Sequence, residues 1–438
     1  MKYTLEILAC HDNPSNLEIL YQNASSNNEL KQFRDNMLTC YQSSPDNLLY
    51  AAWHYRLQNQ NTKKTSASHI VNWKLAILLA IVNGLILWLC SNIILDDSGF
   101  PHYLPLFSAP CTAIFMIVYL SISSKQSRTK AIALQIVILL IIAIYSLLLL
   151  SESSGYFEIM VPHLIALSWG AIALGIINVV SYRTRSRRKN FLFLIKSIDT
   201  IITLGLFVAA TFIFSAVTIS IFSVINITLS DSMTRLVLVG IGGAMPILAL
   251  ATSYNPILDP TKQEYSRGIS WLIGIFPPIL LALTLPVLVV YLTLIPFNFM
   301  EAFNNRDVLI TYNVMLFAIM LLLLVSTPIE TSHKQTPANR ILRLAIIAIA
   351  SLTIIVSFYA LAAVIYRTII FGLTINRATI IGWNAINISL LCIMIFRQVR
   401  CKKDEWITAL QSTFSDGIFI YLIWASLVVA IAPWQFSR

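Results

Sequence analysis

Apolar stretches of about 20 residues recur along most of this 438-residue chain and constrain its fold more than any other feature. Wound as an α-helix, a stretch of that length crosses the roughly 30 Å hydrocarbon core of a bilayer. Only 11% of the residues are charged and 57% are hydrophobic, whereas soluble domains carry about 25% charged residues. A water-soluble fold has too little interior for so much apolar surface. The sequence predicts an all-α, polytopic transmembrane helical bundle.

We place eleven spans in this chain. They lie near 70–94, 103–123, 129–151, 159–180, 199–226, 233–252, 268–294, 308–328, 341–366, 377–396 and 411–432. The fifth span has two readings. It is either an ordinary span or part of one long helix that projects into the cytoplasm, since 191–227 is apolar with few breaks.

Basic residues predict the orientation of the spans. With a cytoplasmic N-terminus, the outer segments hold few of the 30 Lys and Arg residues, namely Arg235, Arg306, Arg367, Arg377 and Arg438. This asymmetry follows the positive-inside rule and predicts an external C-terminus. The net charge of +10 does not indicate nucleic-acid binding, because the basic residues are spread over short loops rather than one soluble face. Membrane lipids are the expected partners.

Residues 1–68 are polar and differ from the rest. Apolar residues recur there at helical spacing in three stretches, beginning near Leu17, Leu30 and Leu48. We expect a small cytoplasmic N-terminal helical segment and a linker, followed by the transmembrane domain at 69–438. A segment of this size has little core of its own. It should therefore dock on the membrane domain or on a cytoplasmic protein partner.

The cysteines give no sign of a disulfide framework or a metal site. They are Cys10, Cys40, Cys90, Cys111, Cys392 and Cys401. None forms a CxxC pair or a zinc-ligand spacing with histidine. Nucleophile, metalloprotease and phosphate-loop motifs are also absent, so we expect no catalytic residues and no cofactor.

Three short motifs in the last third of the chain carry a family resemblance. They are Val308-Leu309-Ile310-Thr311-Tyr312-Asn313, Tyr366-Arg367 and Gly372-Leu373-Thr374-Ile375-Asn376-Arg377. Together with the span layout, they resemble the bacterial membrane family called domain of unknown function 4153, in which a proline stands where this chain has Ile375. The resemblance implies a bacterial inner-membrane protein over about the last two thirds of the chain, and it implies no activity.

Charged residues within spans are costly and are candidates for function by default. Lys196 and Asp199 are three positions apart, so they can pair on one helix face. The alternative is an interfacial pair whose lysine reaches toward the membrane surface. Asp416 lies well inside the bilayer if its helix begins near Ile407, and otherwise marks the cytoplasmic boundary.

Three uncharged polar residues within spans are further candidates. Asn384 and Asn387 share one face of the tenth span, where amides either bond a neighbouring helix or contact a substrate. His163 lies close to Glu158. The two could shuttle protons, or His163 could be a histidine without catalytic duty.

Glycine and proline interrupt the sixth and seventh spans. They are Gly240, Gly242, Gly243 and Pro246 in the sixth, and Pro277, Pro278, Pro286 and Pro296 in the seventh. Such breaks line cavities in transporters or are ordinary kinks.

The turn at 372–377 is expected on the outer face. Gly372 can adopt a positive φ, and Thr374 or Asn376 can cap the next helix. Arg377 would oppose the dipole of that helix. It should therefore pair with Asp307 or a lipid phosphate and help to hold a polar pocket with Tyr312 and Asn313. The alternative is an arginine that reaches lipid headgroups at no particular site.

Three classes of function remain open. The first is non-enzymatic transport or sensing of a small molecule or lipid. The second is an intramembrane enzyme acting on a lipid-linked substrate at the outer face, with Arg367 and Arg377 clamping its headgroup. The third is a membrane scaffold or signalling subunit.

The span count gives a direct test. A reporter that is active only in the cytoplasm, fused after Arg438, should be silent, because eleven spans from a cytoplasmic N-terminus end outside. Fusion after Lys64 supplies the active control. Strong activity of the Arg438 fusion would contradict the count.

Overall fold

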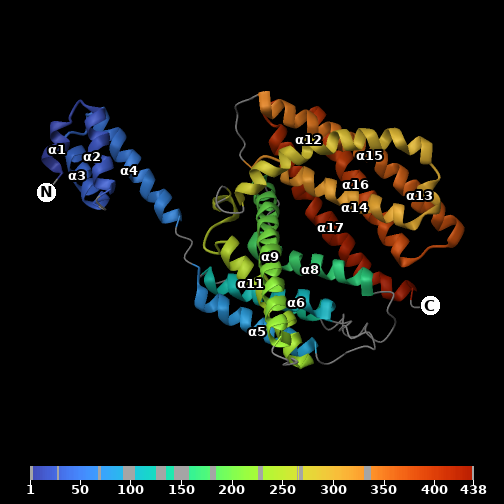
Figure 1. The fold of residues 1–438 in the computed structure, drawn as a ribbon. Helices are drawn as coiled ribbons and strands as arrows, with labels where there is room; N and C mark the ends of the chain where they lie inside the picture. The colour runs from blue at the N-terminus through green and yellow to red at the C-terminus, as the bar shows by residue number, and fades with distance from the viewer. Residues whose placement is uncertain are drawn as a thin grey trace. The chain divides into compact units, whose positions relative to one another are not determined.

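The computed structural model describes residues 3–26, 29–67, 71–91, 104–124, 135–142, 157–177, 184–224, 230–263, 265, 270–329 and 337–436. In these residues the chain forms 16 α-helices and no β-strand (Figure 1). The all-α class predicted from the sequence is confirmed. By its internal contacts the chain divides into two compact units, Met1–Ile70 and Val71–Arg438.

The first unit is built from four helices. They are α1 Thr4–Ala9, α2 Pro14–Ser26, α3 Leu30–Ser43 and α4 Leu48–Ala67. The sequence predicted three of them, and α1 was missed. A helix of 6 residues has fewer than two turns, so it shows no apolar period.

This unit has a hydrophobic core of its own, and the expectation of little core was wrong. Phe33 at its centre is 0% exposed. The Phe33 ring lies 5.8 Å from Tyr3, 5.9 Å from Tyr21 and 6.3 Å from Trp53. Aromatic rings bury large areas and favour these tilted arrangements. The hydroxyl of Tyr50 donates to the Ile7 carbonyl at 3.0 Å, and burial raises the pKa of Tyr50.

Within the described residues, nine helices of the second unit are long and apolar enough to cross a membrane. They are α5 Trp73–Ser91, α6 Leu104–Ser123, α9 Thr184–Val224, the run from α10 Asp231–Arg235 through the π-helix η3 Leu236–Gly240 to α11 Ile241–Ser253, α12 Ser270–Leu294, α14 Arg306–Val325, α15 Pro337–Phe371, α16 Ile375–Arg400 and α17 Trp406–Phe436. Each overlaps a predicted span. The fourth predicted span is the apolar helix α8 Phe157–Ile177. Of the third, only the helical segment 135–142 is among the described residues.

Helix α9 decides between the two readings of the fifth span. It runs without a break for 41 residues, which is about 60 Å at 1.5 Å per residue. A bilayer core needs only about half of that length. The single long helix is therefore the one observed.

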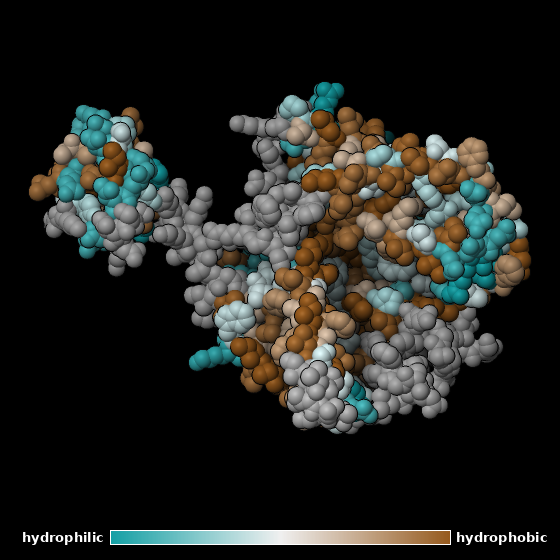
Figure 2. Space-filling model, in the orientation of Figure 1, coloured by the Kyte–Doolittle hydropathy of each residue, from teal (hydrophilic) through white to brown (hydrophobic). Residues whose placement is uncertain are grey.

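The second unit has an apolar outer surface. Figure 2 shows hydrophobic side chains over the visible faces of α9 and α15. On α9, Phe212 is 67% exposed and Ile213 is 64% exposed. Contiguous exposed apolar surface of this extent suits lipid rather than water, which supports a multi-pass membrane protein.

The helices of the second unit pack as two groups. Helices α5, α6 and α11 contact one another, while α12, α14, α15, α16 and α17 form a second set of neighbours. Helices α8 and α9 contact members of both groups, and Figure 1 shows α9 crossing between them. The junction of the two groups is therefore made by α8, α9 and α17.

Two glycines of the sixth span, Gly240 and Gly243, pack against α5, while a Cβ on Gly242 would meet nothing within 4 Å. A Cβ on Gly84 of α5 would lie 2.2 Å from the carbonyl oxygen of Gly240, so only glycine fits there. The side chain of Asn83 is 0% exposed and donates to the Gly243 carbonyl at 2.7 Å and to Thr112 Oγ1 at 3.1 Å. In the described residues, this span packs against α5 and contributes no residue to the pocket described below.

The prolines of the seventh span do not break its helix. Pro277, Pro278 and Pro286 lie inside the continuous helix α12, and Pro296 falls in the short 3-10 helix η5 Ile295–Asn298. Buried Leu281 and Leu288 on α12 belong to the same apolar core as α14, α15, α16 and α17. The seventh span likewise contributes no residue to the pocket described below.

The core of the first unit predicts independent folding. A fragment of residues 1–70 should unfold cooperatively on heating. Phe33→Ala should lower its free energy of unfolding by about 3–5 kcal/mol, because a fully buried ring is replaced by a cavity. Leu48→Ala is the matched control, since Leu48 is 86% exposed and should change stability by less than about 0.5 kcal/mol. Gradual melting of the wild-type fragment would contradict this prediction.

Candidate functional site

Polar side chains from four helices meet inside the second unit. Asn384 of α16 is 1% exposed and donates through Nδ2 to Asn313 Oδ1 of α14 at 2.9 Å. Asn313 Nδ2 donates to the Leu309 carbonyl of its own helix at 2.8 Å. The amide pair therefore fixes α16 against α14, as the sequence suggested for Asn384.

His163 of α8 is held in one protonation state. Its Nδ1 lies 2.6 Å from the Ile159 carbonyl oxygen, which can only accept, so Nδ1 carries the proton. Its Nε2 lies 3.1 Å from Trp383 Nε1 of α16. An indole N–H can only donate, so Nε2 must be the acceptor. Protonation of Nε2 would break this bond.

A proton-shuttle role for His163 is therefore not supported by its contacts. The Trp383 N–H needs an unprotonated Nε2 and so favours the neutral imidazole, while Nδ1 is engaged by the Ile159 carbonyl. The side chain is 2% exposed, and the side chain of Glu158 lies outside the described residues. The geometry favours a histidine that joins α8 to α16.

Tyr421 of α17 completes the polar and aromatic network. Its hydroxyl donates to Asn387 Oδ1 at 2.5 Å, and its ring centroid lies 5.3 Å from Trp383. Asn387 is 0% exposed, and its Nδ2 has no partner among the described residues. Helices α8, α14, α16 and α17 are therefore joined by the network of His163, Trp383, Tyr421, Asn387, Asn384 and Asn313.

Close packing brings α16 and α17 within reach of these bonds. A Cβ on Gly382 would lie 1.9 Å from the ring of Trp424. Any larger residue at 382 would push the two helices apart. The hydrogen bond between Tyr421 and Asn387 requires the same short separation.

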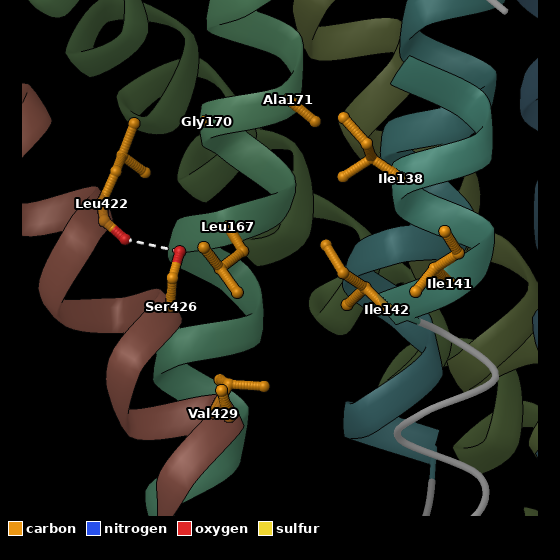
Figure 3. A pocket seen from close by; sticks show the side chains of 10 residues that line it. Ile138, Ile141, Ile142, Leu167, Gly170, Ala171, Leu422, Ser426 and Val429 are labelled. Atoms are coloured by element: carbon orange, nitrogen blue, oxygen red, sulfur yellow. Dashed lines mark hydrogen bonds between the residues drawn. The ribbon is translucent and has the colours of Figure 1, made fainter. Parts of the chain in front are cut away.

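An apolar pocket of about 610 Å³ lies beside this network. Its walls come from the helical segment 135–142, from α8 and from α17 (Figure 3). The lining residues are Ile138, Ile141, Ile142, Leu167, Gly170, Ala171, Leu422, Ser426, Val429 and Ala430. The hydroxyl of Ser426 is engaged with the Leu422 carbonyl at 2.8 Å. The pocket therefore offers almost no free polar group.

The network and the pocket share two helices. Leu167 lies one helical turn after His163 on α8, and Leu422 follows Tyr421 on α17. Gln135 donates to the Ala171 carbonyl at 2.9 Å, which holds the segment 135–142 against α8. Polar bonds thus set the spacing of all three pocket walls.

Lys196 and Asp199 form the predicted pair on α9, with Nζ 2.6 Å from Oδ2. Their side chains are only 7% and 6% exposed. Protein therefore covers both groups of this pair. Lys196 Nζ also lies 5.4 Å from the ring centroid of Tyr265.

A second contact ties α9 to the turn that follows α11. Lys189 pairs with Asp259. Burial raises the pKa of Asp259, but hydrogen bonds from Lys189 and Thr261 outweigh this effect, so its pKa lies below its usual value.

Asp416 lies ten residues into α17, which begins at Trp406. Its helix thus begins close to Ile407, and the depth of Asp416 in the bilayer stays a prediction. Asp416 accepts from Arg397 NH2 of α16 at 2.7 Å and from Arg187 Nε of α9 at 3.0 Å. The carboxylate is thus compensated by two arginines, as a charge among apolar helices requires.

The turn at 372–377 partly follows the prediction. Gly372 has a φ of +79°, and Thr374 Oγ1 caps α16 by accepting from the Arg377 N–H at 3.4 Å. Both expectations are confirmed. Among the described residues, however, Arg377 forms no ion pair with Asp307. Its NH1 donates to the Gly372 carbonyl at 2.6 Å instead.

The remaining predicted residues lie apart from the polar network. Tyr312 packs among aromatic rings, 5.5 Å from Tyr291 and 5.8 Å from Tyr359. Arg367 NH1 donates to the Asn304 carbonyl at 3.0 Å. No hydrogen bond in the described residues joins Arg377 to Tyr312 or Asn313, so the polar pocket expected there is not observed.

Sequence reasoning missed Trp383, Tyr421 and the pocket walls. Trp383 stands immediately before Asn384, and an indole beside a buried amide in a span was a usable signal. Tyr421 carried a weaker signal as a hydroxyl in the middle of an apolar run. The pocket had no signal in the sequence, since its lining residues resemble ordinary lipid-facing residues.

Comparison of the chain with protein-family models, with curated proteins and with solved structures gives no match. The resemblance to domain of unknown function 4153 therefore stays a prediction. Function has to be argued from the geometry.

The amide pair gives a test by double-mutant cycle. Asn384→Leu alone leaves the half-buried Asn313 Oδ1 without a donor and should destabilise the protein by about 1–3 kcal/mol. The double variant Asn313→Leu with Asn384→Leu should lose less free energy of unfolding than the two single variants together. The difference, which is the coupling energy of the pair, should be about 0.5–2 kcal/mol. Thermal unfolding in detergent measures this.

Ser389→Ala is the control on the same helix, because Ser389 is exposed and bonds only its own helix. It should have almost no effect. Strict additivity of the two asparagine changes would show that their hydrogen bond does not hold α14 to α16.

Proposed function

We propose that this chain is a non-enzymatic, multi-pass membrane protein that binds a lipid through its hydrocarbon chain and moves or senses it. The observation that carries this proposal is the apolar pocket of about 610 Å³ between 135–142, α8 and α17. Its volume is within the roughly 300–1,000 Å³ range of small-molecule sites. A polar substrate would lose its hydration there without gaining hydrogen bonds.

The position of the pocket supports the same proposal. It lies where α8 meets α17, at the junction of the two helix groups. Ligand sites occur preferentially at such junctions, because relative movement of the two sides can admit or release a ligand. A lipid that separates α8 from α17 would be coupled to the arrangement of both groups.

The contacts of His163 and the asparagines weigh against the enzyme alternative. Hydrolysis of a lipid-linked substrate needs a free base or nucleophile. His163 is fixed between Ile159 and Trp383, and Asn384 is bonded to Asn313. We therefore assign these residues to positioning α8, α14 and α16.

The orientation is inferred from the charge distribution, and the bacterial inner membrane from the family resemblance. We infer eleven spans, a cytoplasmic N-terminus and an external C-terminus in a bacterial inner membrane. The nine long apolar helices support the membrane location, and the basic residues between predicted spans support the orientation. In this topology, the turn at 372–374 lies on the outer side.

Photolabelling tests the proposal. A phospholipid with a diazirine in its acyl chain, incorporated with the full-length protein into bilayers, should label peptides that contain Leu167 and Val429. Ala430→Phe should reduce this labelling at least about threefold, because the larger side chain occupies pocket volume. Peptide mass spectrometry measures the change.

Leu283→Phe is the matched control, since Leu283 is 60% exposed on α12 and does not line the pocket. It should leave labelling of the pocket peptides unchanged. Labelling spread evenly over all exposed helix faces, with no effect of Ala430→Phe, would contradict lipid binding in the pocket.

A further inference from the structure

Two arginines converge on one exposed aromatic ring at the end of α15. Arg367 Cζ lies 5.8 Å from the ring centroid of Phe371, and Arg377 Cζ lies 5.7 Å from the same centroid. Phe371 is 63% exposed. Both guanidinium groups therefore lie beside the same exposed ring, although they come from different helices.

Backbone carbonyls hold both guanidinium groups in place. Arg367 NH1 donates to Asn304 and Arg377 NH1 donates to Gly372. A guanidinium has five N–H donors in a planar fork, so most donors on each group remain for a ligand. Pre-set orientation lowers the entropic cost of binding.

The charge of this arginine pair is not neutralised within the described residues. No ion pair there includes Arg367 or Arg377. Two acidic residues, Glu301 and Asp307, lie in the segment that Arg367 contacts, and Glu301 accepts from Asn305 Nδ2 at 3.3 Å. Neither carboxylate comes within ion-pair distance of the two arginines. Both positive charges therefore remain available to attract an external anion.

Apolar side chains surround the pair on the same turn. Ile369 is 78% exposed, Ile370 is 52% exposed and Leu373 is 54% exposed. The start of α14 lies close to Arg367, because Arg367 donates to the carbonyl of Asn304, which precedes the α14 N-cap Asn305. Polar helix ends beside exposed apolar residues are typical of the boundary between headgroups and hydrocarbon.

We propose that Arg367 and Arg377 form a binding site for the phosphate of an anionic membrane phospholipid. Two planar guanidinium forks suit phosphate oxygens, while Phe371 and Leu373 enter the upper hydrocarbon. The site is separate from the apolar pocket and stands without it. It also explains how an arginine is tolerated in the first turn of α16, where the helix dipole favours negative charge.

Titration of the purified full-length protein in uncharged detergent tests this site. Dioctanoyl-phosphatidylglycerol should raise the thermal midpoint and bind more tightly than dioctanoyl-phosphatidylcholine. Arg367→Gln with Arg377→Gln should weaken phosphatidylglycerol binding about 100-fold, at about tenfold for each lost charge-assisted contact. Arg367→Lys with Arg377→Lys should fall between, because lysine keeps the charge and loses the fork.

Arg306→Gln is the matched control, since Arg306 is an exposed arginine at the same helix ends. Within the part of the chain that the structure describes, it makes no cation–π contact with Phe371 and no hydrogen bond with Gly372. Its binding should stay within about twofold of wild type. Equal binding by wild type and the double glutamine variant would overturn the site. Equal affinity for both lipids would overturn the preference for an anionic lipid. An equal shift from inorganic phosphate alone would overturn the assignment to a lipid.

Discussion

The lack of water in a hydrocarbon core is the constraint on which the membrane unit depends. A polar group buried there must find its partner in another part of the protein. His163 and Trp383 satisfy each other, and Asn384 is satisfied by Asn313. These bonds run between helices, so the positions of α8, α14 and α16 are set together. Apolar packing alone would allow the helices to slide, since lipid tails are as apolar as the side chains they would replace.

Charged groups on α9 and α17 also have partners within the protein. Asp416 has two arginines as partners, and Lys196 is paired with Asp199. The groups named here are occupied by one another, while Asn387 Nδ2, Trp424 Nε1 and a few other buried polar atoms have no partner among the described residues. What remains between α8 and α17 is an apolar pocket. Hydrogen bonds between helices hold the pocket walls in place. The apolar lining favours binding of a hydrocarbon chain over a polar group.

Local features of this fold could be predicted from the sequence, and long-range partners could not. Apolar length identified the helices, and a spacing of three positions identified the pair of Lys196 and Asp199. The cap at Thr374 followed from local residue chemistry. Trp383 and His163, in contrast, are 220 positions apart, and no local pattern links them. Arg377 was assigned an acidic partner on the basis of charge, whereas a carbonyl five residues away was within reach. The core of the N-terminal unit was also missed, because its rings come from three separate helices.

The central claim is that the polar network fixes α8 and α17 in contact with each other and that a hydrocarbon-binding pocket lies between these helices and the segment 135–142. The most direct test is an electron cryo-microscopy structure of the full-length protein in lipid nanodiscs. The account predicts elongated density between Leu167 and Val429, with Trp383 still bonded to His163. A pocket that is closed by direct contact of α17 with 135–142, or that is filled by side chains of the protein itself, would contradict it.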